Sequence, residues 1–143
     1  MSRILQKRRL VPKIYEMVVE APQIARKAQA GQFVIVMANE TGERIPLTIA
    51  DFDRQAGTIT MVLMVVGTSS LRLSRLEVGD ALYALIGPLG KASQIEDAGA
   101  VVMVAGGVGT APVYPIARCF HESGCRVITI QGARSKDLLF WTD

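Results

Sequence analysis

A glycine-rich segment, Gly106-Gly107-Val108-Gly109, is the part of the sequence best suited to hold a charged ligand. It follows an apolar run at residues 100–105 and precedes a stretch with helical periodicity. Glycines let backbone N–H groups approach a phosphate closely, and a helix N-terminus adds partial positive charge. Tight turns from strand to helix also use glycine for conformational reasons alone. The place of the segment between a strand and a helix favours a dinucleotide or phosphate site.

The residues after these glycines are expected to form a helix with Thr110 as its N-cap and Pro112 in its first turn. Its apolar face has helical spacing and consists of Val113, Ile116, Ala117 and Phe120, and Gly124 is expected to end it. Residues 100–105 and 126–131 have the apolar character of strands buried on both faces. Together they predict a β–loop–α–β unit with a right-handed crossover. A P-loop is disfavoured because no Gly-Lys-Ser/Thr follows the glycines.

Two earlier segments could also hold phosphate. Arg44-Ile45-Pro46-Leu47-Thr48 places an arginine and a hydroxyl at a strand start, where they can hold a pyrophosphate and the edge of a flavin ring. Val65-Val66-Gly67-Thr68-Ser69-Ser70 joins a strand end to a short helix, and its N–H groups and hydroxyls suit an anion. Taken alone, Arg44 is better explained as a solvated surface charge and the second segment as a helix cap.

The elements before Gly90 are mostly short strands, expected at residues 13–19, 32–38, 46–50, 57–66 and 80–86. Their near-regular spacing predicts an antiparallel barrel or sandwich. One short helix is expected among them, capped by Ser69 or Ser70 and continuing to Leu76.

The change of pattern after Gly90 divides the chain into residues 1–95 and 96–143, with the boundary within residues 91–99. The second part holds two strands and the start of a second helix at residues 135–141, whereas a doubly wound nucleotide domain needs about five or six strands. We therefore expect only the first part of such a domain. Leu138, Leu139, Phe140 and Trp141 have no obvious packing partner, and one strand edge is open. We expect self-association through the C-terminal part, or disorder of the last residues.

Composition indicates a globular chain of 143 residues, of which 50% are hydrophobic and 20% charged. The net charge is +3, and basic residues gather near the start, as Arg3, Lys7, Arg8, Arg9 and Lys13. We interpret them as the solvated face of a first strand rather than a patch for an acidic partner or nucleic acid. With 6% aromatic residues there is no row of stacking platforms, so no nucleic-acid partner is expected.

The two cysteines, Cys119 and Cys125, fit no zinc or iron–sulfur spacing, and no metal site is expected. The N-terminus does not resemble a signal peptide, so we expect free thiols and a cytoplasmic protein. Residues 98–117 are uncharged and long enough for a membrane span, but glycines and the prolines Pro112 and Pro115 interrupt them. A strand, a loop and a helix explain that order better than a membrane span.

The three candidate segments, in this order, resemble the ferredoxin–NADP reductase superfamily. The matching order continues through Leu73, Leu76, Gly79 and Asp80, then Gly87-Pro88-Leu89-Gly90, the glycine loop, and Gly132-Ala133-Arg134-Ser135. Within the superfamily, the sequence is most similar to the N-terminal portion of the electron-transfer subunits of bacterial dihydroorotate dehydrogenase. It is equally similar to the small subunit of NADH-dependent ferredoxin:NADP oxidoreductase, also called sulfide dehydrogenase. The resemblance spans the whole chain.

The resemblance implies a six-stranded antiparallel Greek-key barrel that binds FAD, followed by an incomplete parallel βαβ unit that binds NAD(P)H. The implied FAD contacts are Arg44, Ile45, Pro46, Leu47 and Thr48, then Val62, Leu63 and Met64 along the cofactor, and Gly67, Thr68, Ser69 and Ser70 at the pyrophosphate. The implied nucleotide contacts are Gly106, Gly107, Val108, Gly109, Thr110, Ala111 and Pro112. No catalytic side chain is expected, because the cofactor performs the redox chemistry.

The implied function is hydride transfer from NADH or NADPH to N5 of FAD, followed by transfer of single electrons to an iron–sulfur or catalytic partner subunit. Two features depart from the superfamily pattern. Many relatives have arginine where Ile45 stands, and Arg44 would have to substitute. Relatives are also longer and end in a cysteine cluster for [2Fe–2S], which is expected here only in a missing C-terminal part or a partner. The alternative is a flavin- or nucleotide-binding module without independent catalytic activity.

Overall fold

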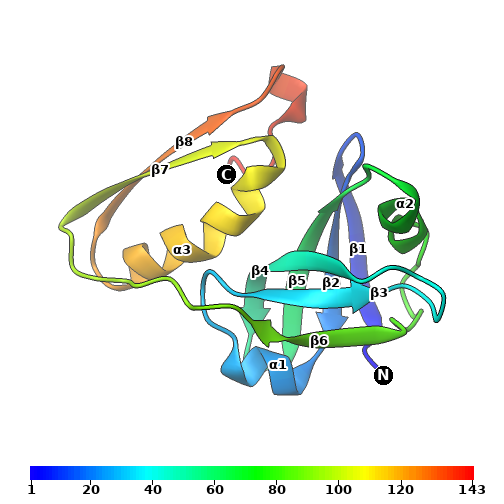
Figure 1. Ribbon diagram of the computed structural model, residues 1–143. Helices are drawn as coiled ribbons and strands as arrows, with labels where there is room; N and C mark the ends of the chain where they lie inside the picture. Colours follow the sequence, from blue (N-terminus) through cyan, green and yellow to red (C-terminus); the bar gives the residue numbers. More distant parts are fainter.

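The computed structural model describes all residues, 1–143, and contains two sheets joined by a segment without regular structure (Figure 1). The larger sheet has six strands: β1 (Ile4–Val11), β2 (Ile14–Glu20), β3 (Phe33–Met37), β4 (Ile45–Asp53), β5 (Thr58–Met64) and β6 (Ala84–Leu89). Their spatial order is β1-β2-β5-β4-β3-β6, and every pairing is antiparallel. Strand β3 follows β2 in the sequence, but β5 and β4 lie between them in the sheet, so that β5 returns to pair with β2. This is the Greek-key order.

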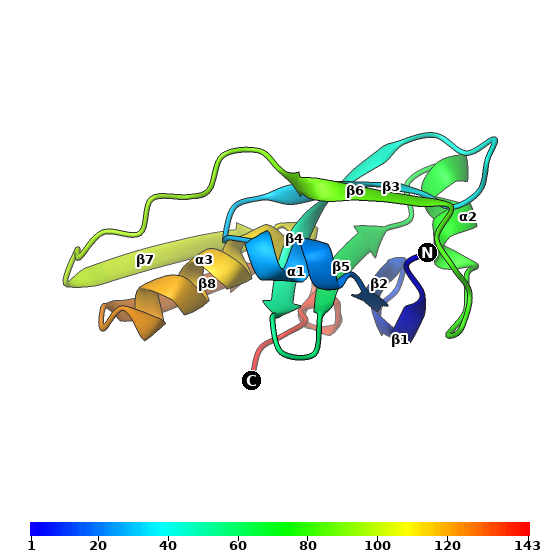
Figure 2. The ribbon, with the colours of Figure 1, turned by 90° about the horizontal axis from the view of Figure 1, so that it is seen from below.

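The six-stranded sheet closes into a barrel because the start of β1 bonds to the segment that leads into β6. The Ile4 N–H donates to the Asp80 carbonyl at 2.9 Å, and the Leu82 N–H donates to the Ser2 carbonyl at 2.9 Å. Alternate residues of the strands point inward, so a buried cluster that includes Ile4, Met17 and Ile49 fills the interior. Helix α1 (Pro22–Lys27) packs on β4, β5 and β6, and helix α2 (Thr68–Ser74) packs on β5 (Figure 2).

The second sheet consists of β7 (Ala100–Gly106) and β8 (Arg126–Gly132), paired in parallel with Val101 opposite Val127. Between them the chain forms a 3₁₀ turn, η1 (Gly107–Gly109), and helix α3 (Thr110–Glu122). Helix α3 contacts β7 and β8 and also β4 of the barrel, so it lies between the two sheets (Figure 1). The predicted fold, a Greek-key barrel followed by an incomplete βαβ unit, is confirmed.

The burial predicted for the parallel strands is wrong on one face. Val102 and Val104 of β7 are 58% and 69% exposed, and Ile128 and Ile130 of β8 are 41% and 53% exposed. Helix α3 covers the opposite face only. A continuous apolar run shows that both faces of a strand favour burial, but the covering elements must come from elsewhere in the fold.

Several element boundaries also differ from the prediction. Thr110 is not an N-cap: η1 runs directly into α3, Gly109 holds the cap position and no side chain caps the helix. The expected second helix at residues 135–141 is only a 3₁₀ turn, η2 (Lys136–Leu138). The strand expected at residues 80–86 begins later, as β6, because residues 79–82 bond to the start of β1. Helix α1 was not predicted, since it is six residues long and begins with a proline.

The C-terminal residues are packed, contrary to expectation. Phe140 is only 6% exposed and belongs to a second buried cluster with Val11, Ile14, Ala50, Val62 and Ala111. Trp141 packs against this cluster. The cluster joins the barrel, the start of α3 and the C-terminal residues. The tail therefore fastens the second sheet to the barrel, and its predicted lack of packing partners is wrong for Phe140 and Trp141.

Candidate cofactor site

The predicted segment at residues 44–48 lies at the start of β4, where it pairs with β3. Thr48 stands opposite Phe33, and Pro46 stands opposite Ile35. Arg44, just before the strand, and Pro46 are exposed. The other three residues, Ile45, Leu47 and Thr48, are partly buried. The segment offers one exposed guanidinium and one partly buried hydroxyl at an edge of the barrel, as an anionic ligand would need.

The segment at residues 62–64 ends β5, beside the start of β2. Leu63 is in the barrel core and 1% exposed, so only its backbone is open to a ligand. Val62 is buried in the cluster that joins barrel and tail. Met64 is 40% exposed and is the side chain of this segment that reaches solvent.

The segment at residues 67–70 begins α2, with Gly67 at the N-cap. The hydroxyl of Ser70 is buried inside the turn, where it accepts the N–H groups of Val66 at 2.9 Å and Gly67 at 3.1 Å and donates to the Gly67 carbonyl at 3.0 Å. Ser70 thus holds the turn in shape from the third position of the helix. The predicted cap at Ser69 or Ser70 is wrong, because Gly67 holds the cap position, and the helix ends at Ser74 rather than Leu76. Ser69 is different, because its hydroxyl donates to the carboxylate of Glu43. This bond brings residues 44–48 and 67–70 next to each other.

The glycine loop has open space where a ligand would approach. A Cβ atom added to Gly67, Gly106, Gly107 or Gly109 would meet no other atom within 4 Å. Gly107 has a φ of +54°, a left-handed conformation that favours glycine. Gly109 has a φ of −61°, which any residue adopts, so neither its backbone nor its neighbours require glycine. Close approach of a ligand to the backbone is a sufficient physical reason for glycine there.

The structure brings the glycine loop against the barrel. The η1 turn contacts β5, and Val108 packs on the cluster that contains Val62 and Ala111. Thr110 is 7% exposed, so the loop is joined to the barrel and does not project freely. The glycine loop therefore lies beside the strand that carries residues 62–64, and residues 44–48 lie on the neighbouring strand β4.

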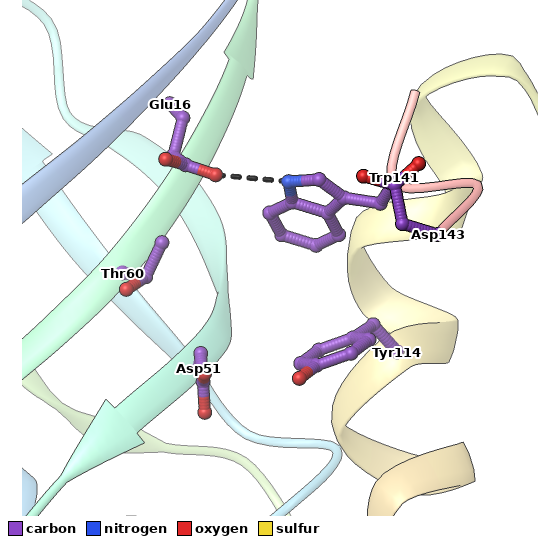
Figure 3. A pocket seen from close by; sticks show the side chains of 6 residues that line it. All are labelled: Glu16, Asp51, Thr60, Tyr114, Trp141 and Asp143. Atoms are coloured by element: carbon purple, nitrogen blue, oxygen red, sulfur yellow. Dashed lines mark hydrogen bonds between the residues drawn. The ribbon is translucent and has the colours of Figure 1, made fainter. Parts of the chain in front are cut away.

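A second feature between the two sheets was not predicted from the sequence. A pocket of about 360 Å³ is lined by Glu16, Asp51, Thr60, Tyr114, Trp141 and Asp143 (Figure 3). The indole N–H of Trp141 donates to Glu16 at 2.9 Å, and the Trp141 and Tyr114 ring centroids are 5.2 Å apart. None of these six residues belongs to the predicted cofactor segments. No pattern in the sequence indicated that these residues lie close together, since Glu16 and Trp141 are 125 residues apart.

Two of the three carboxylates that line this pocket, Glu16 and Asp51, are paired with arginines. Glu16 also binds Arg8 at 3.1 Å, and Asp51 binds Arg118. Burial raises the pKa of the neighbouring Cys119 thiol, against the opposing effect of the Arg118 guanidinium. No three His, Cys, Asp or Glu side chains form a group that could hold a metal ion. No helix has both the length and the apolarity needed to cross a membrane.

Comparison with known proteins identifies the class. No family model matches the chain. A solved NADH-dependent reduced ferredoxin-NADP oxidoreductase superposes on the whole chain with a TM-score of 0.96 at 40% identity, and 52% of that chain is covered. The chain therefore has the ferredoxin reductase-like fold.

Two curated sequence relatives are similar to the chain over its whole length. An electron transfer subunit homolog of dihydroorotate dehydrogenase B (NAD(+)) from Thermotoga maritima is 40% identical over 143 residues. An uncharacterized protein in the adh 3' region of Clostridium beijerinckii is 43% identical over 150 residues. Each alignment includes the whole chain and 51% of the relative, so the chain spans about half the length of the curated relatives it matches. The resemblance to the N-terminal portion of electron-transfer subunits is confirmed.

Proposed function

We propose that the chain is the flavin-binding part, and the first part of the nucleotide-binding domain, of an oxidoreductase that passes electrons from NAD(P)H through FAD to an iron–sulfur or catalytic partner subunit. The proposal rests on the proximity of three segments in the structure. Residues 44–48 and 62–64 lie on or beside the neighbouring strands β4 and β5, and the glycine loop contacts β5. The similarity to an electron transfer subunit homolog and to an NADH-dependent reductase supports the same function.

The residues present fit an extended ligand with a pyrophosphate. Arg44 offers an exposed cation and Thr48 a partly buried hydroxyl, the hydroxyl of Ser69 is bonded to Glu43, and the space beside Gly67 is open. We assign FAD to residues 44–48, 62–64 and 67–70 of a barrel domain, residues 1–95. We assign the pyridine nucleotide to residues 106–112, which lie in the second domain, residues 96–143. The open space beside the glycines there admits a phosphate.

The roles of this chain's own residues are binding and orientation. An FAD held by residues 44–48, 62–64 and 67–70 would supply the redox chemistry: it would take a hydride from NAD(P)H, pass the two electrons on singly and release the proton. The barrel edge holds the cofactor, and the glycine loop presents the nucleotide to it. Both cysteines are free, which supports a cytoplasmic location.

A cofactor-binding module without activity of its own is the second candidate. The candidate segments favour it equally, because the roles that their residues offer are binding and orientation. The two candidates differ in one property: both bind flavin, but only the oxidoreductase is reduced by a nicotinamide nucleotide.

The cofactor assignment is tested by titrating the purified protein with FAD and FMN and following the flavin absorption bands. We expect FAD to bind more tightly, because two phosphate-binding segments fit a pyrophosphate better than a single phosphate. Replacing Thr68 and Ser69 with leucine should release FAD, while the exposed pair Gln55 and Ala56, changed in the same way, should retain it. A doubly substituted protein with full FAD occupancy would contradict the placement of the site.

A further inference from the structure

Helix α3 determines how the two sheets are placed relative to each other. It begins directly after the glycine loop, and it packs on β7 and β8 on one side and on β4 on the other. Strand β4 carries the proposed flavin segment at its start. The position of α3 against β4 therefore sets the position of the glycine loop relative to that segment.

One ion pair joins α3 to β4. The guanidinium of Arg118 binds the carboxylate of Asp51, and their side chains are 25% and 35% exposed. The strand is irregular at this point, because the pairing of β4 with β5 shifts register between Ile49 and Asp51. Such a bulge changes the direction of a side chain. Here the Asp51 carboxylate reaches Arg118 of α3, and Figure 3 shows Asp51 across the pocket from Tyr114 of the same helix. The Phe52 N–H donates to the Asp51 carboxylate at 2.8 Å and fixes it further.

Arg118 is also held by an aromatic ring and by its own helix. Its guanidinium carbon lies 5.1 Å from the centroid of the Phe52 ring, and Nε lies 3.6 Å from a carboxylate oxygen of Glu122. A planar guanidinium can stack flat on a ring while its N–H fork pairs with a carboxylate, a geometry that the compact ammonium of lysine does not reproduce. These groups from β4 and α3 surround the guanidinium of Arg118, although its buried Nε makes no hydrogen bond.

We propose that Arg118 is a positioning residue that, through Asp51 and Phe52, holds the glycine loop in register with the flavin segment of β4. The inference rests on the proposed function. Arg118 lies eight residues after Thr110, or about 12 Å along the helix, so it acts through α3 and not by touching the ligand. A misplacement of about 1 Å at a reacting pair lowers a rate on the order of 100-fold.

The test uses the full-length protein and the variants Arg118→Ala, Arg118→Lys, Asp51→Asn and the double variant Arg118→Ala/Asp51→Asn. Arg126→Ala is the matched control, because Arg126 is an exposed arginine at the start of β8. Two quantities are measured: the steady-state kinetics of NADH oxidation with FAD bound and ferricyanide as the electron acceptor, and amide hydrogen exchange of residues 107–116 in the cofactor-free protein.

We expect Arg118→Ala to lower kcat by about tenfold or more while KM for NADH and FAD content change less than about twofold. Arg118→Lys should recover only part of the loss, and the double variant should be no slower than Arg118→Ala. Hydrogen exchange of the loop should be faster in Arg118→Ala and Asp51→Asn, and unchanged in Arg126→Ala.

An Arg118→Ala protein with unchanged loop exchange, or with unchanged kcat, would overturn the proposal. A different result would contradict the proposed function: the unsubstituted protein would bind no FAD, or its bound FAD would not be reduced by NADH or NADPH. Hydrogen exchange needs no cofactor and decides in that case whether Arg118 holds the loop.

Discussion

At the scale of single residues, the two serines of the proposed pyrophosphate segment, residues 67–70, differ in what their hydroxyls already bind. The hydroxyl of Ser70 is hydrogen-bonded to the backbone of its own turn, whereas the hydroxyl of Ser69 donates to the carboxylate of Glu43. A carboxylate therefore stands where the proposed pyrophosphate would seek the same donor. Glu43 and Arg44 are neighbours of opposite charge at this edge of the barrel, so the affinity for an anionic cofactor depends on both.

Glu43→Gln should strengthen FAD binding. The substitution removes a negative charge next to the pyrophosphate site but keeps the shape of the side chain, and we expect about a fivefold lower Kd, on the order of 1 kcal/mol. Isothermal calorimetry at low and high salt measures the effect, which should shrink as salt rises. Glu40→Gln, an exposed carboxylate in the same loop, is the control. Equal FAD affinity in the Glu43 variant and the unsubstituted protein would count against pyrophosphate at this position.

Gly109→Val should block nucleotide binding and leave FAD bound. The φ of Gly109 suits valine and its added Cβ would meet no protein atom, so a loss of binding reports the ligand and not backbone strain. We expect at least about a tenfold weaker affinity for NADH and NADPH, since the side chain occupies the space of the phosphate. Calorimetry measures the affinity, and an unchanged melting temperature shows an intact fold. Unchanged nucleotide affinity would remove the glycine loop as the binding site.

At the scale of elements, the apolar cluster that contains Phe140 joins four parts of the chain. Its members come from the β1–β2 hairpin, from β4 and β5, from the start of α3 and from the C-terminal residues. These parts are distant in sequence, so the cluster holds the second sheet on the barrel. Trp141 adds a hydrogen bond to Glu16 on β2.

Phe140→Ala should destabilise the protein by about 3 kcal/mol, because a buried phenylalanine leaves a cavity between the barrel and α3. Urea unfolding followed by the fluorescence of Trp141, the single tryptophan, measures the loss. Leu138→Ala, at a partly buried position outside the cluster, should cost about 1 kcal/mol or less. Equal effects of the two substitutions would show that the tail does not fasten the two sheets.

The strands and the helix after the glycines were predictable because their signals are local. Alternation located β2, runs of strand-forming residues between turn signals located β3 to β5, and helical spacing followed by Gly124 located α3. Helix α1 was missed because six residues give too little periodicity, and β6 was placed too early because β1 binds the residues before it. The contacts of Glu43, Asp51 and Trp141 had no local signal, since the fold alone brings distant residues together.

At the scale of the whole molecule, the barrel and the parallel sheet are connected by α3, the apolar cluster and the Arg118–Asp51 pair. This arrangement places the glycine loop beside β5 and gives the flavin and the nucleotide adjacent sites in the proposed function. The chain spans about half of its curated relatives, so electron transfer is a property to test in the full-length protein.

Stopped-flow absorption of the full-length protein tests the central claim most directly. The protein is loaded with FAD, freed of excess cofactor and mixed anaerobically with NADH or NADPH. The proposed function predicts that the flavin band bleaches in a fast phase whose rate saturates with one of the two nucleotides. A protein that holds no FAD, or whose bound flavin is reduced by neither nucleotide, would contradict it.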